Sequence, residues 1–437
     1  MRDAIAIIAV LALLPMLLLL VRFAAKRWNL PAEVRRKSVH IGMGLATLPF
    51  PWLFSSWIPV AILSGLSLVL LTIWKLFDKH TLHGVERKSE GDFWFPVAVV
   101  LVFWMADNGQ TPVLYLVPML VLTLADACGA LVGVSYGKTE IKVLSGHKSI
   151  EGSALVFLVS FLSVHVPVLL MTETGRAESL LIGVVLALVV MLIEGVSVRG
   201  LDNILMPVVA AWLLSRYLDL SVADLAARIG VIAALTAVIL WGKRYSSLEC
   251  GALLAAILFG YAFWALGGWQ FLLLPVILFA EHLWVTRRLK KTFEVVHDLC
   301  AVLSVGLSLL VFLAIKVFAE IDTFPAFAAA TAMHLGILNL TTRTMLARNV
   351  KGGRLILLSL AKTTLLILFI AFLIHQSWLA LAVSTILTGA GLATFRAILG
   401  NPEKYPIDGK RWTIQGVLAC AVGLIVLLLS LSSVGES

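Results

Sequence analysis

Four groups of polar residues interrupt an otherwise apolar sequence, and their types suit the binding of anions and metal ions. The first group is Arg36, Lys37 and His40. Arg36 and His40 are four residues apart, so a helix would place them on one face. Such side chains can bind an anion, or they can anchor a helix among lipid headgroups. The sequence leaves both interpretations open.

The second group is centred on Asp126, which lies inside an apolar run long enough to cross a bilayer. An ionised carboxylate at such a position costs about 2.5–3.5 kcal/mol on insertion scales unless it is paired. Gly129 and Gly133 follow on the same helical face. Glycines there allow close approach of either a ligand or a neighbouring helix. Asp126 is therefore predicted to be functional, and the glycines have two interpretations.

A short loop is expected after this run, and the polar segment of residues 137–151 carries the third group. It combines glycine and lysine residues that suit phosphate oxygens, namely Gly137, Lys138, Lys142 and Lys148. Ser149 is the expected N-cap of the next helix, with Glu151 in its first turn. The free N–H groups of a helix start would add to a phosphate pocket. A positively charged turn is the alternative, and no P-loop pattern is present.

The fourth group comprises Glu194, Asp202 and Asn203. Asp202 and Asn203 stand where a helix begins, so they could be ordinary caps. Glu194, Asp202 and Asp126 are nevertheless expected at one membrane depth. Carboxylates beside lysines and a helix start are typical of a site for Mg²⁺ and a polyphosphate. We therefore predict that these three carboxylates are metal ligands.

The elements that position these groups must be membrane helices. Of 437 residues, 60% are hydrophobic and only 14% are charged, which excludes a soluble enzyme or a disordered protein. We predict an all-α, polytopic transmembrane helix bundle of about sixteen spans. Their expected bounds are 4–23, 38–54, 57–76, 93–107, 112–132, 152–171, 178–196, 203–217, 224–241, 248–266, 270–286, 298–318, 324–341, 355–374, 378–395 and 412–432.

The distribution of charge predicts the orientation. With the N-terminus outside, alternate loops place most of the 34 Lys and Arg residues inside, as the positive-inside rule requires. All four polar groups then face the cytosol from an inner or plasma membrane. The net charge of +9 has this explanation, so we expect the bilayer, and no nucleic acid, as the partner. The oligomeric state stays open.

At these four groups the chain resembles the membrane family of phytol kinases and dolichol (polyprenol) kinases, which is distantly related to phosphatidate cytidylyltransferases. The likeness lies in motifs that occur in the family's order over about residues 32–215, although Ala130 stands one position later than in the family's pattern. The matching positions are Arg36, Lys37, His40, Asp126, Gly129, Gly133, Gly137, Lys138, Lys148, Ser149, Glu151, Gly152, Ser153, Glu194, Gly200, Asp202, Asn203 and Pro207.

The resemblance implies a CTP-dependent kinase for an isoprenoid alcohol, with CTP as co-substrate and Mg²⁺ as cofactor. The implied catalytic residues are His40, Asp126, Lys148, Glu151 and Asp202. The implied nucleotide-binding and substrate-binding residues are Arg36, Lys37, Gly129, Gly133, Gly137, Lys138, Lys142, Ser149 and Asn203. A cytidylyltransferase acting on a lipid phosphate is the alternative, although the signature of that family is not found. A lipid transporter on the same scaffold is a third hypothesis.

The second half has a different character. We predict a catalytic membrane domain over 1–220 and a second membrane domain over 221–437. The second domain weakly resembles phytyl-phosphate kinases, in residues 246–279 and in Val350-Lys-Gly-Gly353. A carboxylate of that family is missing from the segment that ends at His334, so we expect no catalysis there. His334 is interpreted as a histidine satisfied within the bundle, and Lys362 as a lysine that snorkels to the headgroups.

Overall fold

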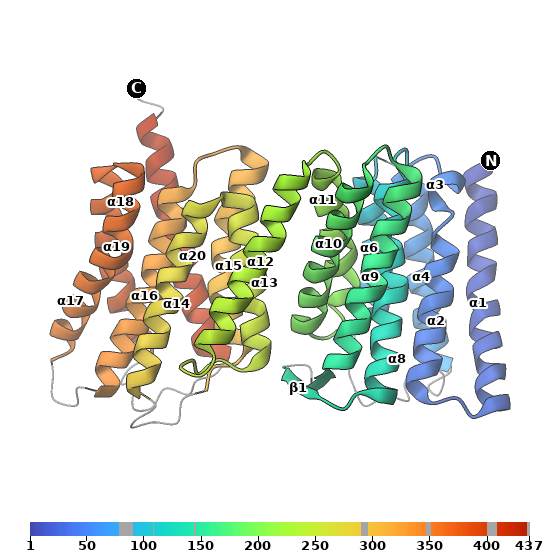
Figure 1. Cartoon of the computed structure of the whole chain (residues 1–437), viewed down its shortest axis with the longest axis horizontal. Coiled ribbons are helices and arrows are strands. Elements are labelled where there is room, and N and C mark those ends of the chain that lie inside the picture. The colour runs from blue at the N-terminus through green and yellow to red at the C-terminus, as the bar shows by residue number, and fades with distance from the viewer. Residues whose placement is uncertain are drawn as a thin grey trace. The chain divides into compact units, whose positions relative to one another are not determined.

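The chain is a bundle of long helices with one small hairpin (Figure 1). The computed structural model describes all residues except 78–90, 108, 144–145, 290–295, 347–350, 400–408 and 435–437. The predicted all-α membrane bundle is confirmed. It divides into two compact units, Met1–Gly230 and Val231–Ser437.

Unit 1 contains the helices that carry the four polar groups. α7, the π-turn η1 and α8 follow one another without a break, and η1 ends directly before Asp126. The elements are α1 (Arg2–Trp28), α2 (Ala32–Thr47), α3 (Phe50–Leu53), α4 (Trp57–Phe77), α6 (Gly91–Met105), α7 (Pro112–Leu120), η1 (Val121–Ala125), α8 (Asp126–Tyr136), β1 (Glu140–Val143), β2 (Gly146–Ser149), α9 (Ile150–Met171), α10 (Arg176–Val196), α11 (Asp202–Tyr217) and α12 (Val222–Gly242), which continues into unit 2.

The polar groups meet at one end of unit 1 because successive helices alternate in direction. The start of α2, the end of α8, the hairpin and the turn from α10 to α11 all lie at the end marked by β1 in Figure 1. The hairpin was not predicted: residues 137–149 were expected to be a loop. Its strands are antiparallel, with Ile141 opposite Lys148.

Unit 2 is built around one buried helix. In α16, 94% of the most apolar 18-residue stretch is buried. Its alanines let neighbouring helices pack closely on every side. The elements are α13 (Cys250–Gly267), α14 (Trp269–Leu289), α15 (Leu299–Ala319), α16 (Phe324–Leu346), α17 (Gly352–Thr363), η2 (Thr364–Leu368), α18 (Phe369–His375), α19 (Trp378–Leu399) and α20 (Gly409–Val434).

Each predicted span overlaps at least one helix, although the bounds differ and the span 38–54 takes in parts of both α2 and α3. Among the described residues, twelve helices are long and apolar enough to cross a membrane. Four further helices do not reach that length or apolar character within the described residues, namely α2, α4, α6 and α11. The total of about sixteen spans therefore stays a prediction. The clearest shift is in α2, which begins at Ala32 instead of residue 38. The first polar group therefore lies within a helix of the bundle.

Candidate active site at one end of unit 1

The centre of the site is a buried ion pair between α2 and α8. Lys37 Nζ lies 2.6 Å from Asp126 Oδ2, and the two residues are only 2% and 8% exposed. This pairing explains how a carboxylate is tolerated inside an apolar helix. It also shows that the interpretation of Lys37 as a headgroup anchor is wrong, because its ammonium group is paired with Asp126 of a neighbouring helix.

His40 lies one turn after Lys37 and joins the same pair. Its Nε2 is 3.5 Å from Asp126 Oδ2 and 3.0 Å from the carbonyl oxygen of Leu122. A carbonyl can only accept, so His40 Nε2 donates to Leu122. Leu122 belongs to the π-turn η1. Such turns are rare, and they occur frequently at functional sites.

Arg36 lies at the edge of this group and has a partner that the sequence interpretation missed. Its guanidinium group binds Glu33 through two hydrogen bonds, of 2.6 and 3.1 Å. The spacing of three residues was a usable signal, because side chains at i and i+3 are neighbours on a helix. Arg36 also has favourable electrostatic interactions with Asp126 and Asp202.

A second ion pair links the hairpin to the end of α10. Lys148 Nζ lies 2.5 Å from Glu194 Oε1 and also donates to the carbonyl oxygen of Glu194. Both side chains are 16% exposed. The other carboxylate oxygen, Glu194 Oε2, is buried and has no hydrogen-bond partner among the described residues. Lys148 and Glu194, 46 residues apart in sequence, therefore share one site.

Asp202 and Asn203 begin α11 after a tight turn. Arg199 and Gly200 have φ of 53° and 86°, a left-handed conformation that glycine adopts without strain. Asp202 Oδ1 accepts a hydrogen bond from the backbone N–H of Asn203. Asn203 Oδ1 is buried and also lacks a partner within the described part of the chain. The turn thus leaves an unsatisfied amide oxygen beside a carboxylate.

Asp202 joins the two ion pairs into one charged cluster. It interacts electrostatically with Asp126 and Glu194, which repel it, and with Lys37 and Lys148, which attract it. We use "charged cluster" for Arg36, Lys37, His40, Asp126, Lys148, Glu194 and Asp202. All four polar groups predicted from the sequence contribute the carboxylates of this cluster or their partners. No three His, Cys, Asp or Glu side chains among the described residues lie close enough to hold a metal without further ligands.

The glycines of the second and third groups lie in a helix contact. A Cβ added at Gly129 would stand 2.3 Å from Val156, and one at Gly137 would stand 2.7 Å from Ser149 Cβ. One at Gly133 would stand 3.2 Å from Ser149 Oγ. Packing of α8 on the start of α9 accounts for these three positions. A role in nucleotide binding stays a prediction.

The remaining residues of the polar segment do not form one group with Lys148. Ser149 is the N-cap of α9, as predicted, because its side chain accepts from Gly152 N–H. Glu151 lies in the first turn of α9, where its carboxylate accepts from Thr139 N–H at 3.4 Å. Lys138 is exposed next to it. The side chain of Lys142 lies outside the described residues.

Unit 2 contains a half-buried ion pair of its own. Lys362 of α17 bonds to Glu281 of α14, and its Nζ lies 4.1 Å from the centre of the Trp284 ring. The interpretation of Lys362 as a snorkelling lysine is therefore wrong. Glu281 was missed, although a glutamate within an apolar run was a usable signal. His334 is satisfied within the bundle, as predicted, by Ser308 at 2.7 Å and Gln415 at 3.1 Å.

Comparison with known proteins agrees with the resemblance of the four polar groups. The chain is 30% identical to the phytol kinase of Synechocystis sp. over 183 residues, which cover 41% of this chain and 78% of that enzyme. No family model matches the chain, and no solved structure does. The relationships to dolichol kinases, cytidylyltransferases and phytyl-phosphate kinases stay predictions. Over the part of its length that aligns, the chain belongs to the phytol kinase family.

Proposed function

We propose that unit 1 is a kinase that transfers the γ-phosphoryl group of CTP to a membrane isoprenoid alcohol. The observation that carries this proposal is the convergence of Lys37–Asp126, Lys148–Glu194 and Asp202 at one end of unit 1. Phosphoryl transfer needs positioned positive charge around the phosphates more than it needs covalent chemistry. The kinship to a phytol kinase supports the alcohol as acceptor.

The lysines of the charged cluster are the groups that would hold the phosphates. Lys37 and Lys148 are each paired with a carboxylate, at 2.6 and 2.5 Å, so their positions are already fixed before substrate binds. Phosphate oxygens can share these ammonium groups with the carboxylates, since an ammonium group has three donors. Arg36, at the edge of the cluster, would neutralise charge further out. Lys138 and Glu151 belong to the same polar segment as Lys148 but lie outside the charged cluster, and there they would contact the nucleotide.

The donor set fits Mg²⁺ when a triphosphate is present. Mg²⁺ is usually held by one or two carboxylates together with water and substrate phosphates. Asp126 and Asp202 are the carboxylates for this role, and the unpartnered oxygens of Glu194 and Asn203 complete the set or receive its waters. When bound, Mg²⁺ neutralises charge on the triphosphate.

His40 is the candidate base. Its Nε2 donates to Leu122, so in the neutral ring Nδ1 is the nitrogen able to accept a proton. In the proposed reaction the alcohol oxygen forms a bond to the γ-phosphorus while the bond to the bridging oxygen breaks. CDP leaves, and the alcohol proton passes to His40.

A double-label experiment tests the reaction. Purified protein receives phytol, geranylgeraniol or a polyprenol with CTP labelled at the α or the γ position. We expect the γ label in a lipid monophosphate and the α label in released CDP. With a lipid phosphate supplied as acceptor, the α label in the lipid and release of pyrophosphate from CTP would indicate the cytidylyltransferase instead. Transport without turnover that survives Asp126→Asn would indicate the transporter.

We also propose that the charged cluster faces the cytosol, where CTP is found, and that residues 221–437 form a non-catalytic second domain. The positive-inside distribution of Lys and Arg supports this orientation. A cysteine introduced at Thr139 should then be labelled only after the membrane is made permeable, whereas one at Glu173 should be labelled from outside. Labelling of the Thr139 position in intact cells would overturn the orientation.

A further inference from the structure

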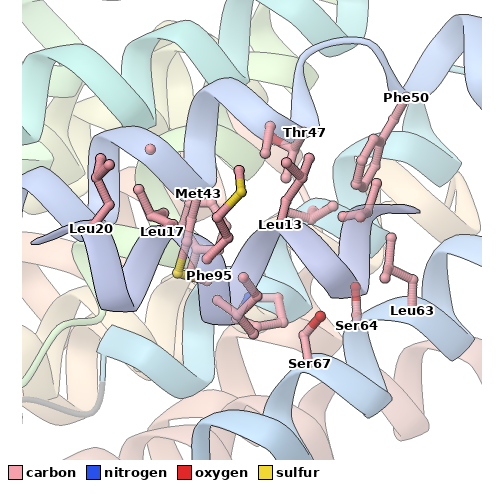
Figure 2. Close-up of a pocket in the computed structure, with 17 residues that line it drawn as sticks. Leu13, Leu17, Leu20, Met43, Thr47, Phe50, Leu63, Ser64, Ser67 and Phe95 are labelled. Carbon is pink, nitrogen blue, oxygen red and sulfur yellow. The ribbon is translucent and has the colours of Figure 1, made fainter. Parts of the chain in front are cut away.

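An apolar cavity lies beside the charged cluster in unit 1. Its volume is about 260 Å³, and it is bounded by α1, α2, α4 and α6 with Phe50 of α3 (Figure 2). Among the described residues, no charged side chain lines it, and the hydroxyl groups in its wall belong to Thr47, Ser64 and Ser67. A cavity with this lining suits a hydrocarbon chain and would repel a nucleotide.

One face of α2 runs from the charged cluster to the cavity. His40, Met43 and Thr47 follow one another at three- and four-residue spacing, so they share one face of α2 over about 10 Å. Met43 and Thr47 line the cavity. Phe95 lines it too, and its ring packs edge-on against the His40 imidazole at 5.4 Å. A molecule lying along this face would therefore place one end at His40.

The two ends of the cavity differ. Phe50, Leu63 and Ser64 lie together at one end in Figure 2, and they are 2%, 2% and 8% exposed. Tyr115 packs behind Phe50, with ring centres 6.4 Å apart. On the side of α1, by contrast, Leu13 and Leu20 are 42% and 64% exposed. The cavity thus has a closed end far from His40 and an apolar side opening at α1.

We propose that this cavity holds the isoprenoid chain of the alcohol, and that its closed end sets the chain length accepted. The inference rests on the proposed function for the identity of the ligand. The hydroxyl group lies at His40, and the chain runs along α2 between Met43 and Phe95 towards Leu63 and Ser64. The chain enters from the bilayer past α1, where Leu13 and Leu20 are exposed.

Substitutions at the closed end test the chain-length rule. Ser64→Leu fills this end, so kcat/KM for geranylgeraniol, with four isoprene units, should fall by about 10-fold or more. The value for geraniol, with two units, should change little. Leu63→Ala enlarges the same end and should shift the preference towards longer alcohols. Gly65→Leu is the matched control, since no atom lies within 4 Å of a Cβ at Gly65.

A general defect would lower the two kcat/KM values in parallel, and it could not give opposite shifts for Ser64→Leu and Leu63→Ala. Unchanged chain-length preference in both variants would overturn the proposal. The KM for CTP should stay constant throughout.

Photolabelling separates this proposal from the proposed function. A geranylgeraniol analogue carrying a diazirine on its chain is bound to full-length protein with Asp126→Asn, which needs no turnover. We expect labelled peptides from α1, α2, α4 and α6, and loss of the label when geranylgeraniol competes. If this labelling is found but the wild-type protein phosphorylates no alcohol, the proposal for the cavity stands and the proposal of a kinase is rejected. Labelling elsewhere, or competition by phospholipid but not by geranylgeraniol, would reject the cavity even if the kinase is active.

Discussion

Both units contain an ion pair between a lysine and a carboxylate, which is buried in unit 1 and half-buried in unit 2, and in each a π-turn adjoins one partner. In unit 1 the turn η1 ends just before Asp126, and in unit 2 the turn η2 begins just after Thr363, beside Lys362. The surroundings of the two pairs differ. Around Lys37–Asp126 lie His40, a second ion pair and an apolar cavity, whereas Lys362 lies against the ring of Trp284.

This difference shows which feature marks a site. A buried ion pair alone is weak grounds for either stability or function, because desolvation of the charges offsets much of their attraction. Unit 1 adds two carboxylates that repel each other, together with buried carboxylate and amide oxygens of Glu194 and Asn203 that lack partners among the described residues, whereas the buried oxygens without partners in the described part of unit 2 are threonine hydroxyls. Such groups are tolerated when a ligand completes them. The comparison therefore supports the proposal that the chemistry takes place in unit 1, and the following predictions test it.

The largest effect is expected for Asp126→Asn. The substitution keeps the shape of the side chain and removes its negative charge next to Lys37. We expect kcat to fall at least about 100-fold, the scale for loss of one preorganised electrostatic group, with a smaller change in KM for CTP. Steady-state kinetics with γ-labelled CTP measure both, and size-exclusion chromatography checks the fold. Activity near the wild-type level would place the chemistry outside unit 1.

A smaller effect is expected for Lys148→Ala. A lysine that contacts a phosphate acts in the ground state and in the transition state alike, so the KM for CTP should rise about 10-fold. Lys148→Arg should recover part of the affinity, since the charge is kept. The variant also leaves Glu194 without its partner. Glu194→Gln, assayed alongside, separates loss of phosphate binding from disorder of the hairpin. An unchanged KM in Lys148→Ala would remove Lys148 from the nucleotide site.

Gly129→Ala should act on stability more than on chemistry. The new Cβ would stand 2.3 Å from Val156, and overpacking of this kind costs about 1–3 kcal/mol. We therefore expect a lower Tm in detergent, with kcat nearly retained at low temperature. Gly353→Ala in unit 2 is the matched control, because a Cβ there meets no atom within 4 Å. Loss of nucleotide affinity at wild-type Tm would instead favour a ligand contact for Gly129.

The smallest effect on activity is expected in unit 2. Glu281→Gln and Lys362→Met, alone or together, remove an ion pair that we place outside the charged cluster. Each single variant should lower Tm, because one charged partner is left buried, and the double variant should recover part of the loss. Turnover should stay near the wild-type rate in all three. A strong loss of kcat with unchanged Tm would reveal that unit 2 takes part in the reaction.

The class of fold and the elements of the site could be predicted because their signals are local. Apolar run length alone locates nearly every helix, and Asp126 was identified because a carboxylate inside such a run needs a partner. The N-cap at Ser149 and the satisfied His334 were also predictable. The predicted loop of residues 137–149 was wrong, because a two-stranded hairpin depends on pairing that a glycine-rich and lysine-rich segment does not specify by its pattern.

The sequence by itself determined a membrane helix bundle, its polar groups and their kinship to phytol kinases. Tertiary structure alone decided which charges pair, because Lys37 and Asp126 are 89 residues apart and Lys362 and Glu281 are 81 apart. It also decided that the glycines pack helices and that a cavity begins beside His40. Apolar side chains occur throughout this chain, so residue types alone cannot indicate where a cavity forms. Only the packing of α1, α2, α4 and α6 leaves one next to the charged cluster.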